Sequence, residues 1–316
     1  MQDVSSELVP GAGPRPQRFL AFASAPNLYT WGTISPVLLW VALFTIFPFA
    51  FAIYLSVHKY HLIQQDHPFV GLRNFERVIA DEQFLVAGRN TLLFSLWAVV
   101  LVTMIGLFAA LLLNNRLRGF GVLRALTLLP WAMPLVSAGI IWKLMLHGNF
   151  GAINGLLLQF GFIDNYVSFL GQMPEAFFAV LVAHAWREFP LATILFLAAL
   201  QTIPLELYDA AKVDGAGRWA RFRYITLPLL RPTFLIVVVY QTMIGIAVFD
   251  LVYVLTGGGP GTGTTLISWL AWTTTFKSLN LARGAALSFI MALALGLLIF
   301  VYMRVLRVEE NHENAA

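Results

Sequence analysis

The chain of 316 residues has no cysteine, and charged side chains make up only 11% of it. Without cysteine there is no disulfide bond, no thiol nucleophile and no cysteine metal ligand. Soluble domains usually have about 25% charged residues, so the low charge excludes an ordinary soluble fold. The net charge of +4 is small, and in a membrane protein basic residues reflect orientation. We therefore expect no nucleic acid partner.

Metal-binding and catalytic patterns are also missing. His58, His61 and His67 lie in one polar segment, but no carboxylate or further histidine there completes a metal-ligand spacing. We therefore expect a surface cluster and no metal site. No Ser-His-Asp arrangement or catalytic pair of carboxylates stands out, so the sequence does not indicate an enzyme.

Long apolar runs dominate what is present. Hydrophobic residues make up 59% of the chain, and the mean hydropathy is +0.76. Apolar surface in such excess must face hydrocarbon, so we predict an all-α polytopic membrane protein. A span of an apolar core of about 30 Å takes roughly 20 residues. Six runs reach that length: residues 34–57, 90–113, 123–146, 174–200, 232–255 and 282–303. Prolines within them predict kinks, at Pro36, Pro48, Pro130, Pro134 and Pro190.

Lysine and arginine predict the orientation of these spans. They are more frequent in the terminal segments and in the second-to-third and fourth-to-fifth connections than in the opposite connections, and residues 147–175 contain none. Basic residues favour the cytoplasmic side, so both termini are predicted to be cytoplasmic. The predicted parts are an N-terminal tail at 1–33, a transmembrane domain at 34–303 with a cytoplasmic loop at about 201–231, and a C-terminal tail at 304–316.

The cytoplasmic loop contains a short amphipathic pattern, "DAAKVDGAGRWARFRYITLP", at residues 209–228. One face of a helix would carry Leu207, Ala210, Ala211 and Asp214 at the spacing i, i+3, i+4 and i+7. The two alanines make that face nearly flat, and Gly215 is suited to end the helix as a left-handed cap. A second helix is expected from about Gly217 until Pro228, with its arginines near membrane lipid. The first helix suits a groove on another protein, although a loop resting on the membrane remains the alternative.

This pattern resembles the cytoplasmic signature loop of ABC importer permeases. In that family the loop reads Glu-Ala-Ala, three residues, Gly, and later Ile-x-Leu-Pro. The chain has both alanines, Gly215 and "ITLP" at 225–228, but Asp209 stands where the family usually has glutamate. The resemblance covers about residues 30–305. It includes four further segments, at 70–75, 90–94, 129–134 and 249–260, and the last is similar to the carbohydrate-uptake branch.

The resemblance implies a type I ABC importer permease in a bacterial plasma membrane. Its cargo would be a di- or oligosaccharide, with trehalose among the candidates. The implied partners are a second homologous permease subunit, two cytoplasmic ABC ATPase subunits and an extracytoplasmic sugar-binding protein. ATP would be bound by the ATPase, so no cofactor is expected in this chain. The implied ATPase-coupling residues are Asp209, Ala210, Ala211, Asp214 and Gly215.

Polar and aromatic residues inside the spans are the candidates for a substrate path. Ionisable groups at membrane depth cost about 2.5–3.5 kcal/mol or more, so they usually face a bundle interior or a water-filled path. Sugars are bound by planar hydrogen-bonding groups and by aromatic rings. On these grounds the candidates are Trp131, Trp142, Asn154, Trp186, Arg187, Gln241, Asp250 and Tyr253. The alternative is that Arg187 pairs with Glu188 and only holds helices together, and that His184 is an ordinary core histidine.

The glycine-rich "GGGPG" at 257–261 does not predict nucleotide binding. A phosphate-binding loop closes with Gly-Lys-Ser/Thr ahead of a helix, whereas Gly263 is followed by Thr264 and no lysine is present. We expect a loop that redirects the chain between spans. A second glycine, Gly106, forms a small-residue spacing with Ala110 that permits close helix packing.

Two other functions remain open from the sequence. An ion-coupled secondary transporter would carry intramembrane carboxylates and inverted repeats, and only Glu188 and Asp250 are present, without a visible repeat. An ABC importer permease for a different cargo, such as glycerol phosphate, would carry the same cytoplasmic loop.

Overall fold

The computed structural model describes residues 28–114 and 120–313. Most of the predicted N-terminal tail at 1–33 lies outside the described residues, as do Arg116 and Arg118. The described residues are mainly helical and include no β-strand. The prediction of an all-α fold is therefore confirmed.

The helices follow one another with short connections, and three of them, named η, are π-helical turns. Their bounds are α1 Leu28–Val41, η1 Ala42–Ile46, α2 Phe47–Val57, α3 Arg73–Ile79, α4 Glu82–Leu113, α5 Phe120–Thr127, α6 Leu129–Ala132, α7 Leu135–Met145, α8 Ala152–Gln159, α9 Glu175–Thr202, α10 Leu205–Val213, α11 Arg218–Arg221, η2 Phe222–Thr226, α12 Leu227–Leu229, α13 Arg231–Ala247, α14 Asp250–Leu255, α15 Ile267–Trp272, η3 Thr273–Lys277 and α16 Leu281–Glu313.

The chain divides into two compact units, residues 1–52 and 53–316. In the first unit the described residues form one apolar helix, made of α1, η1 and the start of α2. The second unit contains all the other helices and the buried core.

Of the six predicted spans, four correspond to single long helices and two overlap bent pairs of helices. Among the described residues, four helices are long and apolar enough to cross a membrane, at Trp31–Val57, Glu82–Leu113, Glu175–Thr202 and Leu281–Arg304. The pair Gly121–Ala132 and Leu135–Met145 is bent by 95°, and the pair Arg218–Leu229 and Arg231–Ala247 by 64°. The count reaches six if each pair is one span, which agrees with the prediction.

Two of the predicted spans are interrupted. The break in the third falls at Met133 and Pro134, as the proline predicts. The run at 232–255, predicted as one span, does not form a single helix, because the chain leaves the helix at Val248 and Phe249 before α14 begins. The Val248 carbonyl, which a continuous helix would have used internally, accepts a hydrogen bond from the Ser268 hydroxyl.

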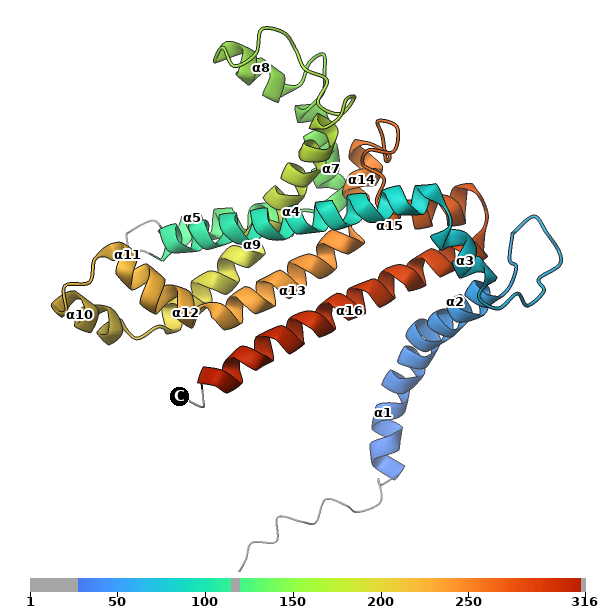
Figure 1. Ribbon diagram of the computed structural model, residues 1–316, viewed down its shortest axis with the longest axis horizontal. Helices are drawn as coiled ribbons and strands as arrows, with labels where there is room; N and C mark the ends of the chain where they lie inside the picture. The colour runs from blue at the N-terminus through green and yellow to red at the C-terminus, as the bar shows by residue number, and fades with distance from the viewer. Residues whose placement is uncertain (1–27, 115–119, 314–316) are drawn as a thin grey trace, which may run out of the picture. The chain divides into compact units, whose positions relative to one another are not determined.

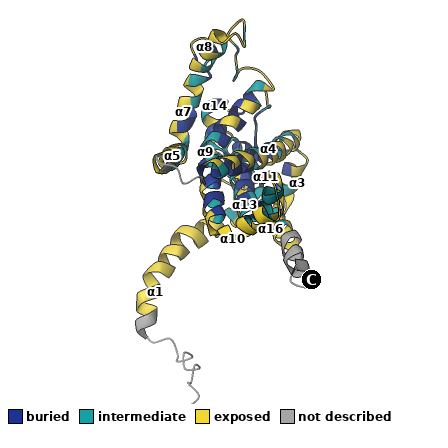
Figure 2. Cartoon of the chain, turned by 90° about the vertical axis from the view of Figure 1, so that its left-hand side faces the viewer, coloured by how far each residue is buried: buried dark blue, intermediate teal, exposed yellow. Residues whose placement is uncertain are grey.

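The core of the second unit is built around α4 and α9, with α13 against both (Figure 1). Figure 2 shows buried residues concentrated where these helices meet. Gly106 of α4 lies directly against α9, where an added Cβ would be 2.6 Å from the Ala192 Cβ. Phe94, Ala98 and Val102 continue this buried face of α4. The small-residue spacing at Gly106 thus permits close packing of these two helices, as predicted.

Candidate functional site

A cavity of about 290 Å³ lies between α6, α7, α9, α13 and the start of α14. Three of the predicted substrate-path residues line it, namely Trp131, Arg187 and Asp250. Glu188, the expected partner of Arg187, lines it as well, and so do three polar or aromatic residues that were not predicted to line a path: His184, Tyr240 and Phe249. Apolar side chains complete the wall: Leu135, Ile244, Ala247, Val248 and Leu251.

Helical spacing and the two chain breaks place these side chains together. His184, Arg187 and Glu188 are at i, i+3 and i+4 on α9, so they share one face of that helix. The break after α13 turns Phe249 and Asp250 toward the same cavity, because the chain leaves the helix just before them.

The ionic groups of α9 are paired with each other. Arg187 donates from Nη1 to Oε1 of Glu188, and the exposed fractions of the two side chains are 17% and 1%. Both ring nitrogens of His184 and Oε2 of Glu188 are buried and make no hydrogen bond to any other described residue. The imidazole packs edge-on against Phe94 at a centroid distance of 5.4 Å. The cavity therefore has hydrogen-bonding atoms that the described residues do not use.

The other predicted path residues lie outside this cavity. Trp142 and Trp186 pack edge-to-face at 5.9 Å, and Gln241 is fully buried on α13. Tyr253 belongs to an aromatic cluster with Phe249, Trp269 and Trp272, with ring centroids 5.4–5.9 Å from its own.

Asn154 is fully buried in α8 and has a structural arrangement. Its side chain accepts a hydrogen bond from the Val167 N–H at 3.0 Å and donates to the Val167 carbonyl at 2.9 Å. Its Nδ2 also donates to the His147 carbonyl at 3.3 Å. These bonds tie together the segment between α7 and α9. The Asn154 amide is therefore used within that segment and not at the cavity.

The predicted coupling segment forms α10, which ends as its sequence indicates. Gly215 has a φ of +78°, and the Ala216 N–H donates to the Ala211 carbonyl at 2.8 Å, which closes the helix in a left-handed cap. Asp209 pairs with Lys212 at 2.6 Å, and both side chains are more than half exposed. The Tyr208 hydroxyl lies 2.9 Å from that of Thr226 and connects α10 to η2.

The second helix of the loop begins after Gly217 as predicted, but it does not stop at Pro228. Pro228 lies in the first turn of α12, and the break comes at Leu230 before α13. Because proline has no N–H, it cannot bond to the carbonyl four residues earlier. The chain adopts a π-helical turn just before it, in which the Leu227 N–H bonds to the Phe222 carbonyl.

The glycine-rich segment at 257–261 makes a tight turn. Gly257, Gly258 and Gly261 all have positive φ values, which glycine adopts without steric cost. A Cβ on Gly258 would lie 2.4 Å from Nε1 of Trp269. Thr264 and Thr265 donate hydrogen bonds to the carbonyls of Gly259 and Gly258 at 2.7 and 3.0 Å. The segment redirects the chain between α14 and α15.

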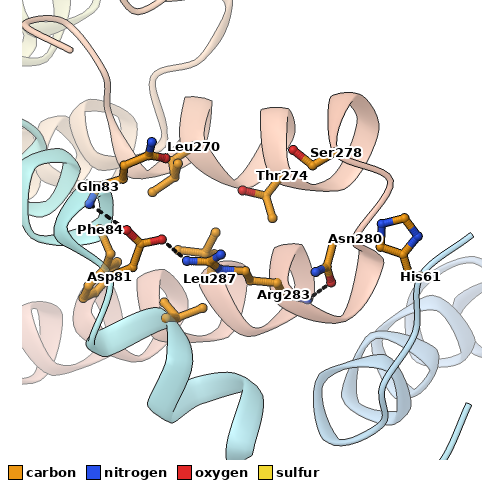
Figure 3. Close-up of a pocket in the computed structure, with 11 residues that line it drawn as sticks. His61, Asp81, Gln83, Phe84, Leu270, Thr274, Ser278, Asn280, Arg283 and Leu287 are labelled. Carbon is orange, nitrogen blue, oxygen red and sulfur yellow. Dashed lines mark hydrogen bonds and ion pairs between the residues drawn. The ribbon is translucent and has the colours of Figure 1, made fainter.

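A second polar pocket of about 240 Å³ joins the start of α4 to α15, η3 and α16 (Figure 3). Asp81 connects the elements around this pocket, because each of its two carboxylate oxygens has a partner. Oδ1 accepts a hydrogen bond from the Gln83 N–H at 2.8 Å, which caps α4. Oδ2 forms an ion pair with Arg283 of α16. No local pattern in the sequence indicates this pair, since its members are 202 residues apart.

We predict that the cap matters more to stability than the ion pair does. Replacing Asp81 by alanine removes both interactions, whereas asparagine keeps an oxygen that can cap α4. Loss of an N-cap costs about 1 kcal/mol, and partly exposed ion pairs contribute about 0–1 kcal/mol. Thermal unfolding in detergent should rank the proteins as wild type, Asp81→Asn and then Asp81→Ala, with the larger drop in melting temperature between the two variants. Equal melting temperatures for the two variants would contradict the capping role.

Residues 102–311 match the family described as the binding-protein-dependent transport system inner membrane component. The chain belongs to this family. The match includes α9, α10, α13 and every residue that lines the cavity.

Curated relatives extend the similarity over most of the chain. The trehalose/maltose transport system permease protein MalF of Thermococcus litoralis is 41% identical over 88% of this chain and 93% of its own length. The sulfoquinovosyl glycerol transport system permease protein SmoG of Agrobacterium fabrum is 33% identical over 88% of this chain and 90% of its own. The sn-glycerol-3-phosphate transport system permease protein UgpA of Yersinia pestis is 33% identical over 85% and 91%.

A solved structure shares the fold of this family member. A chain of a bacterial ABC transporter involved in the import of the acidic polysaccharide alginate superimposes with a TM-score of 0.77. The superposition covers 88% of this chain and 95% of the alginate transporter chain, at 23% sequence identity. The type I importer permease fold expected from the signature loop is confirmed.

Proposed function

We propose that this chain is the permease subunit of an ATP-driven importer of di- or oligosaccharides, and that the α6–α9–α13 cavity holds the sugar during translocation. The observation that carries the proposal is the composition of the cavity wall. Trp131, Tyr240 and Phe249 provide rings, while Arg187 and Asp250 provide hydrogen-bonding groups. This combination suits a sugar, which presents both apolar ring faces and hydroxyl groups.

The proposed complex contains a second homologous permease subunit, two cytoplasmic ATPase subunits and an external sugar-binding protein. We propose α10 as the element that docks on the ATPase. It is short and exposed, and its alanine-rich face permits close approach of another backbone. Closure of the ATPase and docking of the binding protein would both favour the outward-open state. ATP binds to the ATPase, and this chain contributes no catalytic group.

Uptake by the reconstituted complex tests the proposal. The complex is purified through a tag on this chain, placed in liposomes with the binding protein, and supplied with labelled trehalose or maltose. Accumulation is expected to require ATP. Accumulation driven by an ion gradient without ATP would instead support a secondary transporter, and ATP-dependent uptake of glycerol phosphate alone would identify a different cargo.

Trp131→Ala tests the cavity itself. Loss of the ring is expected to reduce trehalose uptake at low substrate concentration about tenfold, because one lost aromatic contact costs on the order of 1–2 kcal/mol. Trp97→Ala is the matched control, since Trp97 is an exposed tryptophan of α4 outside the cavity. Equal uptake by the two variants would show that the sugar does not contact Trp131.

A further inference from the structure

The charges on the cavity wall do not cancel. Among the described residues that line it, the charged groups are Arg187, Glu188 and Asp250, and none is a lysine. The guanidinium of Arg187 is engaged by Glu188, and that carboxylate is almost completely buried beside it. Within the residues that the structure describes, no lysine or arginine forms an ion pair with Asp250. The wall therefore presents one compensated pair and one carboxylate without a cationic partner.

We infer that the cavity selects uncharged sugars and rejects anionic ones, with Asp250 repelling an anion and Glu188 neutralising the arginine that would otherwise attract it. This inference rests on the proposed function of the cavity. Carboxylate oxygens accept hydrogen bonds from the hydroxyl groups of a neutral sugar. A phosphate, sulfonate or carboxylate on the solute would instead face a like charge at close range, which disfavours the wrong partner.

A preference for uncharged solutes would distinguish between cargoes that similarity to the relatives does not distinguish. Their names include neutral trehalose and maltose as well as two anionic compounds, sulfoquinovosyl glycerol and sn-glycerol-3-phosphate. Membership of the family therefore does not decide the charge of the cargo. The pairing of Arg187 with Glu188 is the local feature that decides it here, since an unpaired arginine is the usual bidentate partner of a phosphate.

Asp250 has an alternative role, because it stands in the first turn of α14, where a negative charge stabilises a helix. That role predicts a change in stability but not in the preference for neutral over anionic solutes. The decisive readout is therefore a ratio of two affinities, not either affinity alone.

The test uses the purified complex without the external binding protein, because that protein would select cargo independently. Two labelled probes of similar size are compared by equilibrium binding, trehalose and trehalose 6-phosphate. Wild type is expected to prefer trehalose by about tenfold or more, as expected for one unfavourable charge contact. Asp250→Asn is expected to reduce this preference about tenfold. Glu188→Gln, which releases Arg187, should shift it in the same direction.

Asp164→Asn is the matched control, since Asp164 is an exposed carboxylate outside the cavity. This variant should prefer trehalose over trehalose 6-phosphate to the same extent as wild type. If Glu188→Gln fails to fold, the Asp250→Asn ratio decides alone. Trehalose binding with an unchanged ratio in Asp250→Asn would overturn the charge inference and leave the proposed function standing. Binding of neither probe by wild type would overturn both.

Discussion

Replacing Gly106 by leucine is expected to leave little folded protein in the membrane. Gly106 lies where α4 and α9 make close contact, and even a single added Cβ would come within 2.6 Å of the Ala192 Cβ and 3.2 Å of its carbonyl carbon. The carbonyl carbon of Ala192 is a backbone atom, which cannot move aside as a flexible side chain could. The two helices would have to separate, and overpacking of this kind costs about 1–3 kcal/mol or more. Gly106→Ala should be intermediate.

Gly88 supplies the matched control because it lies in the same helix with open space around its Cβ position. Gly88→Leu and Gly88→Ala should therefore both fold normally. Size-exclusion chromatography of a fluorescent fusion in mild detergent would give the yield of folded protein, and heating before injection would give its melting temperature. A normal yield and melting temperature for Gly106→Leu would show that α4 and α9 do not need this close contact.

The sequence predicts the spans well because the length of an apolar run is a local property. Proline also gives the break at Pro134 correctly, through its missing N–H. The break at Val248 has no such local signal, since neither Val248 nor Phe249 disfavours a helix strongly. The partner of the freed Val248 carbonyl is Ser268, whose hydroxyl donates a hydrogen bond to it from 20 residues further along the chain. A pattern within one run cannot reveal a partner that only folding brings near.

The same limit explains the mixed result for the candidate cavity. Arg187 and Asp250 are recognisable as charges within apolar runs, and the structure places both at the cavity. Tyr240 and Phe249 carry no such signal, because an aromatic residue in a span faces lipid as often as a core. The i, i+3, i+4 spacing of His184, Arg187 and Glu188 does indicate a shared polar face. That pattern was available in the sequence and could have assigned His184 to the cavity.

Ala210→Glu is expected to abolish transport while leaving the protein folded and inserted. Ala210 is exposed on α10, so the larger side chain meets nothing inside the chain itself. Nearby apolar side chains are also uncovered, with Val213 88% exposed and Leu205 63% exposed. If α10 docks on the ATPase, a glutamate on its flat face adds both bulk and an unpaired charge to a close contact, which costs several kcal/mol. Recovery of the ATPase with the tagged chain should fall at least about tenfold, and ATP-dependent uptake should be lost.

Two further variants separate docking from general damage. Ala210→Ser keeps a small side chain and should retain both ATPase recovery and uptake. Ala152→Glu adds the same charge at an exposed alanine of α8, in the segment between α7 and α9, and should bind the ATPase normally. Normal ATPase recovery together with normal uptake by Ala210→Glu would mean that α10 does not dock as proposed. Normal recovery with lost uptake would place α10 in the transmission of ATPase closure to the spans, because the subunits would then assemble without driving transport.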